Sequence, residues 1–175
     1  MTDREPITLQ QVFNRAWQAF IVEGKPPATK NGQCTYRFSR IGDKGPAVRE
    51  CSKCAIGLAL ADDQLDILTD RYMDNSPVNI IIARFPQWFQ SAEEHWPDSL
   101  PTRVDSDFST GGDIVRYVFR DAQCSLHDYC LDPRDASKFV SPDAMRRAYM
   151  AFAKRYKLTI PEKSNDNKNN ASASV

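Results

Sequence analysis

The fold is decided by residues 113–130, which read DIVRYVFRDAQCSLHDYC. Apolar side chains recur here at three- and four-residue intervals, the spacing that places them on one face of an α-helix. They are Val115, Val118, Phe119, Ala122, Leu126 and Tyr129. Arg116, Arg120, Gln123 and His127 follow one another in a polar row beside this face. The stretch therefore predicts a long helix that packs one side into a core.

Two more helices are indicated by the residues at their starts. Thr8 is a good N-cap and Gln11 follows three residues later, which together make a capping box. The apolar residues after it keep helical spacing to Phe20, and Gly24 marks the end of this helix. Ser141-Pro142 predicts the start of the last helix, with Ser as the cap and Pro at the first helical position.

Shorter elements are expected in the middle of the chain. Asp62 or Asp63 should cap one short helix. Ser76-Pro77 should open another helix, which Pro86 must split near Phe85. Residues 54–60 are apolar and rich in helix formers, so they predict a buried helical turn.

Residues 33–50 have a different composition. Cys34 to Phe38 has the composition of a strand, and residues 42–46 (GDKGP) have the composition of a turn. Residues 47–49 could pair back on the first strand. The sequence thus predicts a mainly helical α+β fold, with about five helices and a small antiparallel β-hairpin near residues 33–50. Residues 1–161 are expected to form a single globular domain, and the polar tail 162–175 to be disordered.

The overall composition limits the partners. The chain has 23 basic and 23 acidic residues, so no net charge attracts it to nucleic acid or to anionic lipid. No signal peptide is recognisable in the sequence, and no apolar run is long enough to span a membrane. An odd count of five cysteines argues against a disulfide framework. We therefore expect a cytoplasmic protein without a membrane or nucleic-acid partner, and the sequence does not indicate its oligomeric state.

The cysteines suggest a zinc site as one interpretation. Cys51 and Cys54 have the C-x-x-C spacing of a zinc knuckle, and Cys124 and His127 supply two more ligand types at the same spacing. Four such ligands would complete a tetrahedral structural site. The second pair, however, is predicted inside a helix rather than at a tight turn, and free cysteines are common small core residues. The sequence therefore favours buried thiols and no cofactor, with zinc as the alternative.

A thiol enzyme is another interpretation. Cys54 would be the nucleophile if it starts a helix, His127 its base, and Asp128 the carboxylate that orients the imidazole. On a continuous helix Asp128 would point about 100° away from His127, which makes it a poor orienting group. The chain also lacks the P-loop, Rossmann, Gly-x-Ser-x-Gly and His-Glu-x-x-His motifs, which counts against the common nucleotide-binding and hydrolase classes.

Binding of a small ligand is the third interpretation. Tyr36, Arg37, Arg116 and Arg120 could converge in a cleft, since guanidinium groups and aromatic faces suit phosphate-bearing ligands. The alternative for the arginines is a solvated helix face with ordinary ion pairs.

Three pieces of the chain together resemble a known group of proteins. They are Thr8 to Phe13, Cys34-Thr35-Tyr36-Arg37 followed by Lys53-Cys54-Ala55-Ile56-Gly57, and Leu126-His127-Asp128 before the helix that ends Ala153 to Leu158. Their order resembles a family of small, largely uncharacterised proteins encoded by bacteriophages and prophages. The resemblance implies Cys34, Tyr36, Arg37, Cys54, Gly57, His127 and Asp128 as recurrent positions. Cys51 is extra to that pattern, and Ala61-Asp62-Asp63 stands where Pro-Asp-Glu is usual.

The resemblance implies a context and no reaction. Small accessory phage proteins often act by binding a host protein or a signalling molecule, which is an analogy at the level of the family. We therefore expect an accessory protein of phage type in the cytoplasm of a bacterial host. It would bind a host protein or a small ligand without catalysis, and the cysteine-dependent enzyme is the alternative.

Overall fold

The structure is a computed structural model, and it describes residues 4–26, 28–30, 33–41, 49–92, 95 and 111–161. These residues form a mainly helical α+β fold. The α-helices are α1 (Leu9–Ala16), α2 (Asp62–Asp70), α3 (Val78–Arg84), α4 (Gly111–Leu126) and α5 (Pro142–Arg155). A π-helix, η1 (Trp17–Val22), continues α1, and two short 3-10 helices are η2 (Pro86–Trp88) and η4 (Asp128–Cys130). The predicted tail at 162–175 lies outside the described residues.

The strands pair locally, as antiparallel neighbours. β1 (Thr29–Lys30) pairs with β2 (Gln33–Cys34), β3 (Arg37–Ile41) with β4 (Arg49–Lys53), and β5 (Leu131–Asp132) with β6 (Asp135–Phe139). The β3–β4 hairpin is the predicted one, but its first strand begins three residues later than the sequence pattern indicated. The β5–β6 hairpin was not predicted, because its strands lack the alternation of apolar and polar residues that indicates a half-buried strand.

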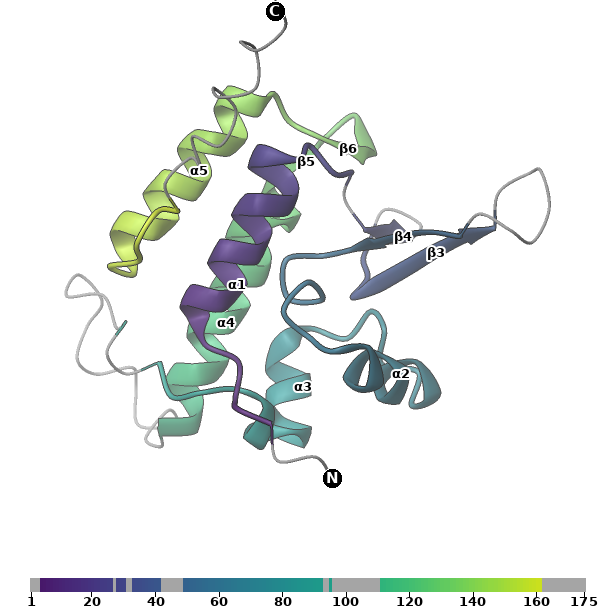
Figure 1. Ribbon diagram of the computed structural model, residues 1–175, viewed down its shortest axis with the longest axis vertical. Coiled ribbons are helices and arrows are strands. Elements are labelled where there is room, and N and C mark those ends of the chain that lie inside the picture. Colours follow the sequence, from purple (N-terminus) through teal and green to yellow (C-terminus); the bar gives the residue numbers. More distant parts are fainter. Residues whose placement is uncertain are drawn as a thin grey trace, which may run out of the picture.

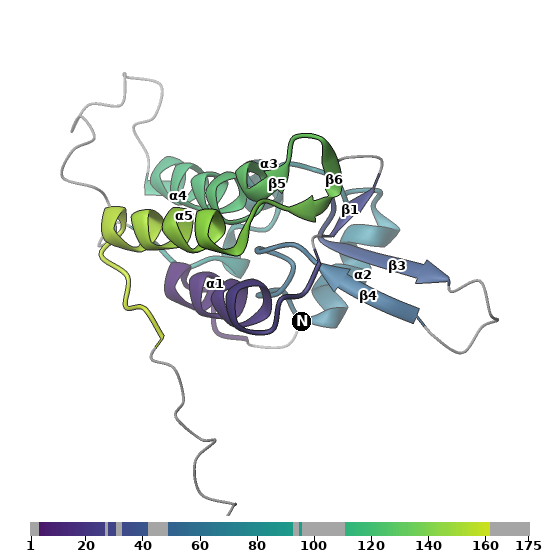
Figure 2. The same cartoon turned by 90° about the horizontal axis from the view of Figure 1, so that it is seen from above.

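Helices α1, α4 and α5 lie side by side and form the main helical layer, with α3 packed against α4 (Figure 1). The β3–β4 hairpin extends away from this layer, and α2 lies beside the hairpin (Figure 2). The buried apolar residues form one cluster that runs from Ile7 to Leu158. Its largest members are aromatic, and the rings of Phe13, Trp17 and Tyr149 contact one another between α1 and α5.

The predicted start of α1 is confirmed in detail. Thr8 Oγ1 accepts the Gln11 amide at 3.0 Å, and Gln11 Oε1 accepts the Thr8 amide at 3.0 Å. The end of this helix differs from the prediction, because it widens into the π-helix η1, in which the Glu23 amide donates to the Gln18 carbonyl five residues back. A π-helix holds about one more residue per turn than an α-helix. Ala19 and Phe20 are both buried within it.

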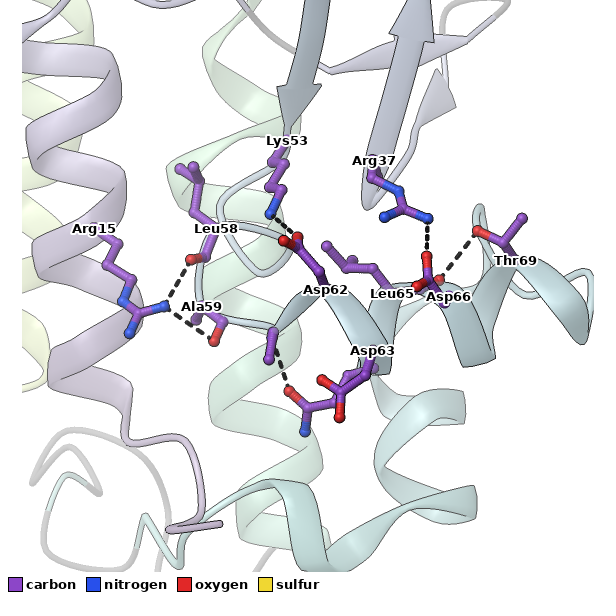
Figure 3. Close-up of polar contacts among 12 residues, drawn as sticks. Arg15, Arg37, Lys53, Leu58, Ala59, Asp62, Asp63, Leu65, Asp66 and Thr69 are labelled. Carbon is purple, nitrogen blue, oxygen red and sulfur yellow. Dashed lines mark hydrogen bonds and ion pairs between the residues drawn. The ribbon is translucent and has the colours of Figure 1, made fainter. Parts of the chain in front are cut away.

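Charged pairs hold α2 against the β3–β4 hairpin (Figure 3). Arg37 and Lys53 are partners across the hairpin. Lys53 Nζ donates to Asp62 Oδ1 at 2.9 Å, and Arg37 donates to Asp66 one helical turn further on. The predicted aspartate cap of α2 is therefore wrong: the N-cap is Ala61, and Asp62 is already helical and pairs with Lys53.

Pro86 interrupts the third helix as predicted. α3 ends at Arg84, Phe85 is not helical, and Pro86 opens the 3-10 turn η2. The predicted cap, Ser76, is one residue too early, because the N-cap is Pro77. Beyond η2 the expected helical phase is lost, since Phe89 is extended and bridges to Ile7.

Candidate functional site

The end of α4 places the histidine of the predicted site. α4 stops at Leu126, four residues before the predicted end, and the Tyr149 hydroxyl donates to the Leu126 carbonyl at 2.6 Å. His127 is then non-helical, with φ −141° and ψ −67°. Its Nδ1 lies 3.1 Å from Asp128 Oδ1. The expectation that Asp128 points away is therefore wrong, because the continuous helix on which it depended ends before His127.

The His127 imidazole is completely buried among aromatic rings. Its ring centroid lies 6.1 Å from that of Phe20 in η1 and 5.7 Å from that of Phe139 in β6. These two phenyl rings also contact each other, at 4.9 Å between centroids. A ligand in solvent therefore does not reach the imidazole from this side without moving the phenyl rings.

Cys54 opens a buried turn, as the sequence predicted for residues 54–60. Its Sγ accepts the Gly57 amide at 3.4 Å, and its carbonyl accepts the Leu58 amide at 2.9 Å. Gly57 passes so close to the Tyr36 backbone that an added Cβ would lie 1.9 Å from the Tyr36 carbonyl oxygen. The thiol of Cys54 is completely buried, which favours a structural role for it.

The hydroxyl of Tyr149 connects this turn with the end of α4. Burial raises the pKa of Tyr149 well above its usual value, and the nearby thiols of Cys130 and Cys54 add to the effect. Both thiols therefore lie close enough to the Tyr149 hydroxyl to interact with it electrostatically. Cys54 and the end of α4 thus belong to the same part of the core.

The other two cysteines whose side chains the structure describes, Cys124 and Cys130, have raised pKa values. Burial raises the pKa of Cys130 to about 11, and it also raises the pKa of the half-buried Cys124. Within the residues that the structure describes, no three His, Cys, Asp or Glu side chains form a group that could hold a metal ion. The side chain of Cys51 lies outside that part of the structure, so the zinc site of Cys51, Cys54, Cys124 and His127 stays a prediction.

The four residues that were predicted to bind a ligand make contacts within the protein or lie in solvent. The Tyr36 side chain is buried, and its hydroxyl donates to the Ser76 carbonyl at 2.7 Å. Arg37 pairs with α2, as described above. On α4, Arg120 donates to Gln123 Oε1 at 2.8 Å and lies 4.0 Å from Asp128 Oδ2, while Arg116 is exposed. None of the four lines the cavity between η1 and α5 that is described next.

One cavity of about 400 Å³ lies where η1 ends and α5 begins. Residues 20–26 form one wall, and residues 138–146 form the other. The side chains of Phe20, Phe139, Val140 and Met145 make this lining apolar, and the two phenyl rings also contact the ring of His127. This cavity has the size and the apolar lining of an ordinary small-molecule site.

Three cations and one acid also line this cavity. Lys25 pairs with Glu23 at 2.6 Å, and Lys138 pairs with Asp135 at 2.9 Å. Arg146 differs from the lysines, because its guanidinium lies 5.6 Å from the ring centroid of Trp17 and makes no ion pair with the described residues. Among these three cations, Arg146 is the one without a carboxylate partner in the described residues.

This cavity could not be predicted from the sequence. Its two walls are more than 110 residues apart in the chain, and the basic residues Lys25, Lys138 and Arg146 share no recognisable spacing. The one local signal is the Phe20-Ile21-Val22 run ahead of Gly24, which reads as the ordinary end of a helix.

Comparison with known proteins does not assign the chain to a family. No family model, curated protein or solved structure matched the chain. Among the described residues, no helix is both long and apolar enough to cross a membrane.

Proposed function

We propose that the protein acts by binding, without catalysis, and that its ligand is a small amphipathic anion held in the η1–α5 cavity. The observation that carries the proposal is a cavity of about 400 Å³ that has an apolar lining and includes Arg146, a cation without a carboxylate partner, among its lining residues. This combination suits a ligand with an aliphatic or aromatic body and a carboxylate or phosphate head group.

The apolar walls supply the bulk of the binding free energy. Phe20, Phe139, Val140 and Met145 come from three different elements and line one space. Each methylene group transferred from water to such a surface contributes about 0.8 kcal/mol. A ligand that buries four to six methylene groups would gain about 3–5 kcal/mol in this way, before the cost of immobilising it is subtracted.

Arg146 supplies the recognition of charge. Stacking on Trp17 restrains the guanidinium, so less side-chain entropy is lost when it binds an anion. An arginine fork can donate two parallel hydrogen bonds to a carboxylate or a phosphate. Lys25 and Lys138 add positive potential nearby, although each already has a carboxylate partner.

The wider role is proposed from the sequence. The resemblance to phage-encoded proteins supports an accessory function in a bacterial host, and the predicted phosphate-bearing ligand agrees with a cationic cavity. The proposal moves the binding residues from Tyr36, Arg37, Arg116 and Arg120 to Arg146 and its neighbours. A host protein as partner stays a prediction from the same resemblance.

Isothermal titration with matched probes tests this proposal. Octanoate and octyl phosphate should bind, whereas octanol, which has the same body without the charge, should bind at least ten times more weakly. Arg146→Gln should weaken octanoate binding by about tenfold or more. Arg147→Gln is the matched control, because Arg147 is exposed on the same helix and does not line the cavity.

Two results would overturn the proposal. One is equal binding of octanol and octanoate, which would show that Arg146 contributes no recognition of charge. The other is an equal loss of affinity in the Arg146→Gln and Arg147→Gln proteins, which would place the anion elsewhere on α5.

A further inference from the structure

The net charge of the chain is zero, but its charged residues are divided unevenly between the helices. α5 has four basic residues and one acidic residue, whereas α2 has four acidic residues and no basic one. α5 lies on the opposite side of the helical layer from α2 in both views (Figures 1 and 2). An anionic partner therefore meets a basic surface at α5, although the chain as a whole is neutral.

Three basic residues of α5 share one exposed face. Arg146, Arg147 and Lys154 are all exposed and form no ion pair with the described residues. At 100° per residue they fall within an arc of about 100° around the helix. Arg155 lies outside this arc, and its guanidinium donates to Asp121 of α4 at 2.8 Å. We call Arg146, Arg147 and Lys154 the basic face of α5.

The packing of α5 holds this face in solvent. Met145, Tyr149 and Phe152 lie on the other side of the helix and are buried in the core. The Tyr149 hydroxyl also donates to the Leu126 carbonyl at 2.6 Å. These contacts fix the rotation of α5 about its axis, so the basic face is a permanent feature of the surface.

The surface chemistry of α5 separates the classes of anionic partner. Within α5, whose side chains are all described, Met150 is the one large apolar side chain that is exposed. A helix that binds a membrane surface inserts an apolar face, and the apolar face of α5 is already buried. The centre of a protein–protein interface is also apolar. Phosphate groups need only basic and polar contacts, so this face favours the backbone of a nucleic acid.

The spacing of the basic residues suits a B-form duplex. Arg146 and Lys154 are eight residues apart, which is about 12 Å along the helix. The major groove of B-DNA is also about 12 Å wide. Side chains at the two ends of the basic face can therefore reach phosphates on both sides of one groove.

We propose that the basic face of α5 binds the phosphate backbone of B-form duplex DNA without reading its sequence. Arg147 and Lys154 contact phosphates on opposite sides of the groove, and Arg146 adds a third positive charge at the border of the η1–α5 cavity. Asp143, an exposed carboxylate at the start of α5, opposes binding and keeps it weak. The proposal does not depend on the anion site in the cavity, because neither Arg147 nor Lys154 lines that cavity.

Fluorescence anisotropy with a labelled DNA duplex of about 20 base pairs tests this inference. At about 20 mM salt, three phosphate contacts should give a Kd on the order of 10⁻⁵ M, equal for two unrelated sequences. A plot of log K against log salt concentration should have a slope of about −3, because each neutralised phosphate contributes about −0.9. Polyglutamate and phosphatidylserine vesicles, the probes for an acidic protein and for a membrane, should displace the duplex only at a large excess of charge.

Charge-removing variants complete the test. Arg147→Gln and Lys154→Gln should each weaken duplex binding about tenfold or more at this salt concentration and bring the slope closer to zero by about 1. Both should bind octanoate like the parent, so loss of octanoate binding alone concerns the cavity and not this face. Arg84→Gln is the matched control, because Arg84 is exposed on α3.

Three results would overturn the inference. One is a slope near zero, which would mean that no phosphate is neutralised. Another is a loss of affinity in the Arg84→Gln protein as large as that in the Arg147→Gln and Lys154→Gln proteins. The third is displacement of the duplex by polyglutamate or by phosphatidylserine vesicles at an equal concentration of charge, which would assign the face to an acidic protein or to a membrane.

Discussion

Replacing Gly57 with alanine should destabilise this protein far more than an ordinary glycine substitution does. An alanine Cβ at this position would lie 1.9 Å from the Tyr36 carbonyl oxygen, 2.8 Å from its carbonyl carbon and 3.1 Å from its Cα. All three contacts are to backbone, so no side-chain rotation relieves them. The turn and the Tyr36 backbone must separate by about 1.5 Å to reach van der Waals distance.

That separation would disturb contacts that hold Tyr36 in place. The Tyr36 amide donates to the Asp74 carbonyl at 3.0 Å, and its hydroxyl donates to the Ser76 carbonyl at 2.7 Å. Overpacking a core costs about 1–3 kcal/mol, and each weakened hydrogen bond adds about 1 kcal/mol. We expect Gly57→Ala to lower the unfolding free energy by about 3–5 kcal/mol, which corresponds to a Tm decrease of about 6–20 °C.

Gly24→Ala is the control that separates steric clash from backbone freedom. Gly24 has φ +64°, and an added Cβ there meets nothing within 4 Å. Its substitution should therefore cost only the strain of the left-handed conformation, about 1 kcal/mol. Urea unfolding followed by circular dichroism gives both values on one scale. A loss for Gly57→Ala no larger than that for Gly24→Ala would refute the close approach of the turn to Tyr36.

Three further predictions concern stability and thiol chemistry. Tyr72 follows α2 with φ +56° and a side chain that is 96% exposed, so Tyr72→Gly should relieve backbone strain and raise the unfolding free energy in urea titrations by about 0.5–1 kcal/mol. Tyr149→Phe removes a buried hydrogen bond and leaves the Leu126 carbonyl unsatisfied, so the same titrations should show a loss of about 2 kcal/mol. Burial raises the pKa of Cys130 to about 11, so its alkylation by iodoacetamide, followed by peptide mass spectrometry, should be slow at pH 8 and accelerate about tenfold per pH unit until the pH approaches 11.

Each of these three predictions has a contrary outcome. A Tyr72→Gly protein less stable than the parent would show that the tyrosine ring makes a contact worth more than the strain. An unchanged Tyr149→Phe protein would mean that solvent or another donor satisfies the Leu126 carbonyl. Rapid alkylation of Cys130 at pH 8 would contradict its burial, and a rate independent of pH would contradict a protonated thiol.

The starts of several helices could be predicted from the sequence because their signals are local. The Thr8–Gln11 capping box formed as expected. Ser141 caps α5, with its Oγ accepting the Ala144 amide at 3.3 Å, and Pro86 ended α3 where predicted. In each case the residues involved lie within about four positions of one another, so their interaction survives any arrangement of the rest of the chain.

The errors occur where distant residues intervene. Asp62 was expected to be a cap, but Lys53 of β4 reaches it and Ala61 takes the cap position. α4 was expected to continue through His127, but it ends where Tyr149 of α5 binds the Leu126 carbonyl. Local patterns contain no information about a partner that folding brings in from another element, so these two positions could not be predicted.

The sequence by itself determined the class of fold, the approximate positions of its helices and the presence of a hairpin after residue 33, since these follow from hydrophobic spacing and from the conformations that proline and glycine allow. It also suggested Cys54, His127 and Asp128 as parts of one site, and the joint role of the three stays a prediction. Only the tertiary structure decided that the first two are buried, that Asp128 meets His127 and that a cavity lies between the end of η1 and the start of α5. The reason is that a cavity is made by side chains far apart in sequence, whose meeting depends on how whole elements pack.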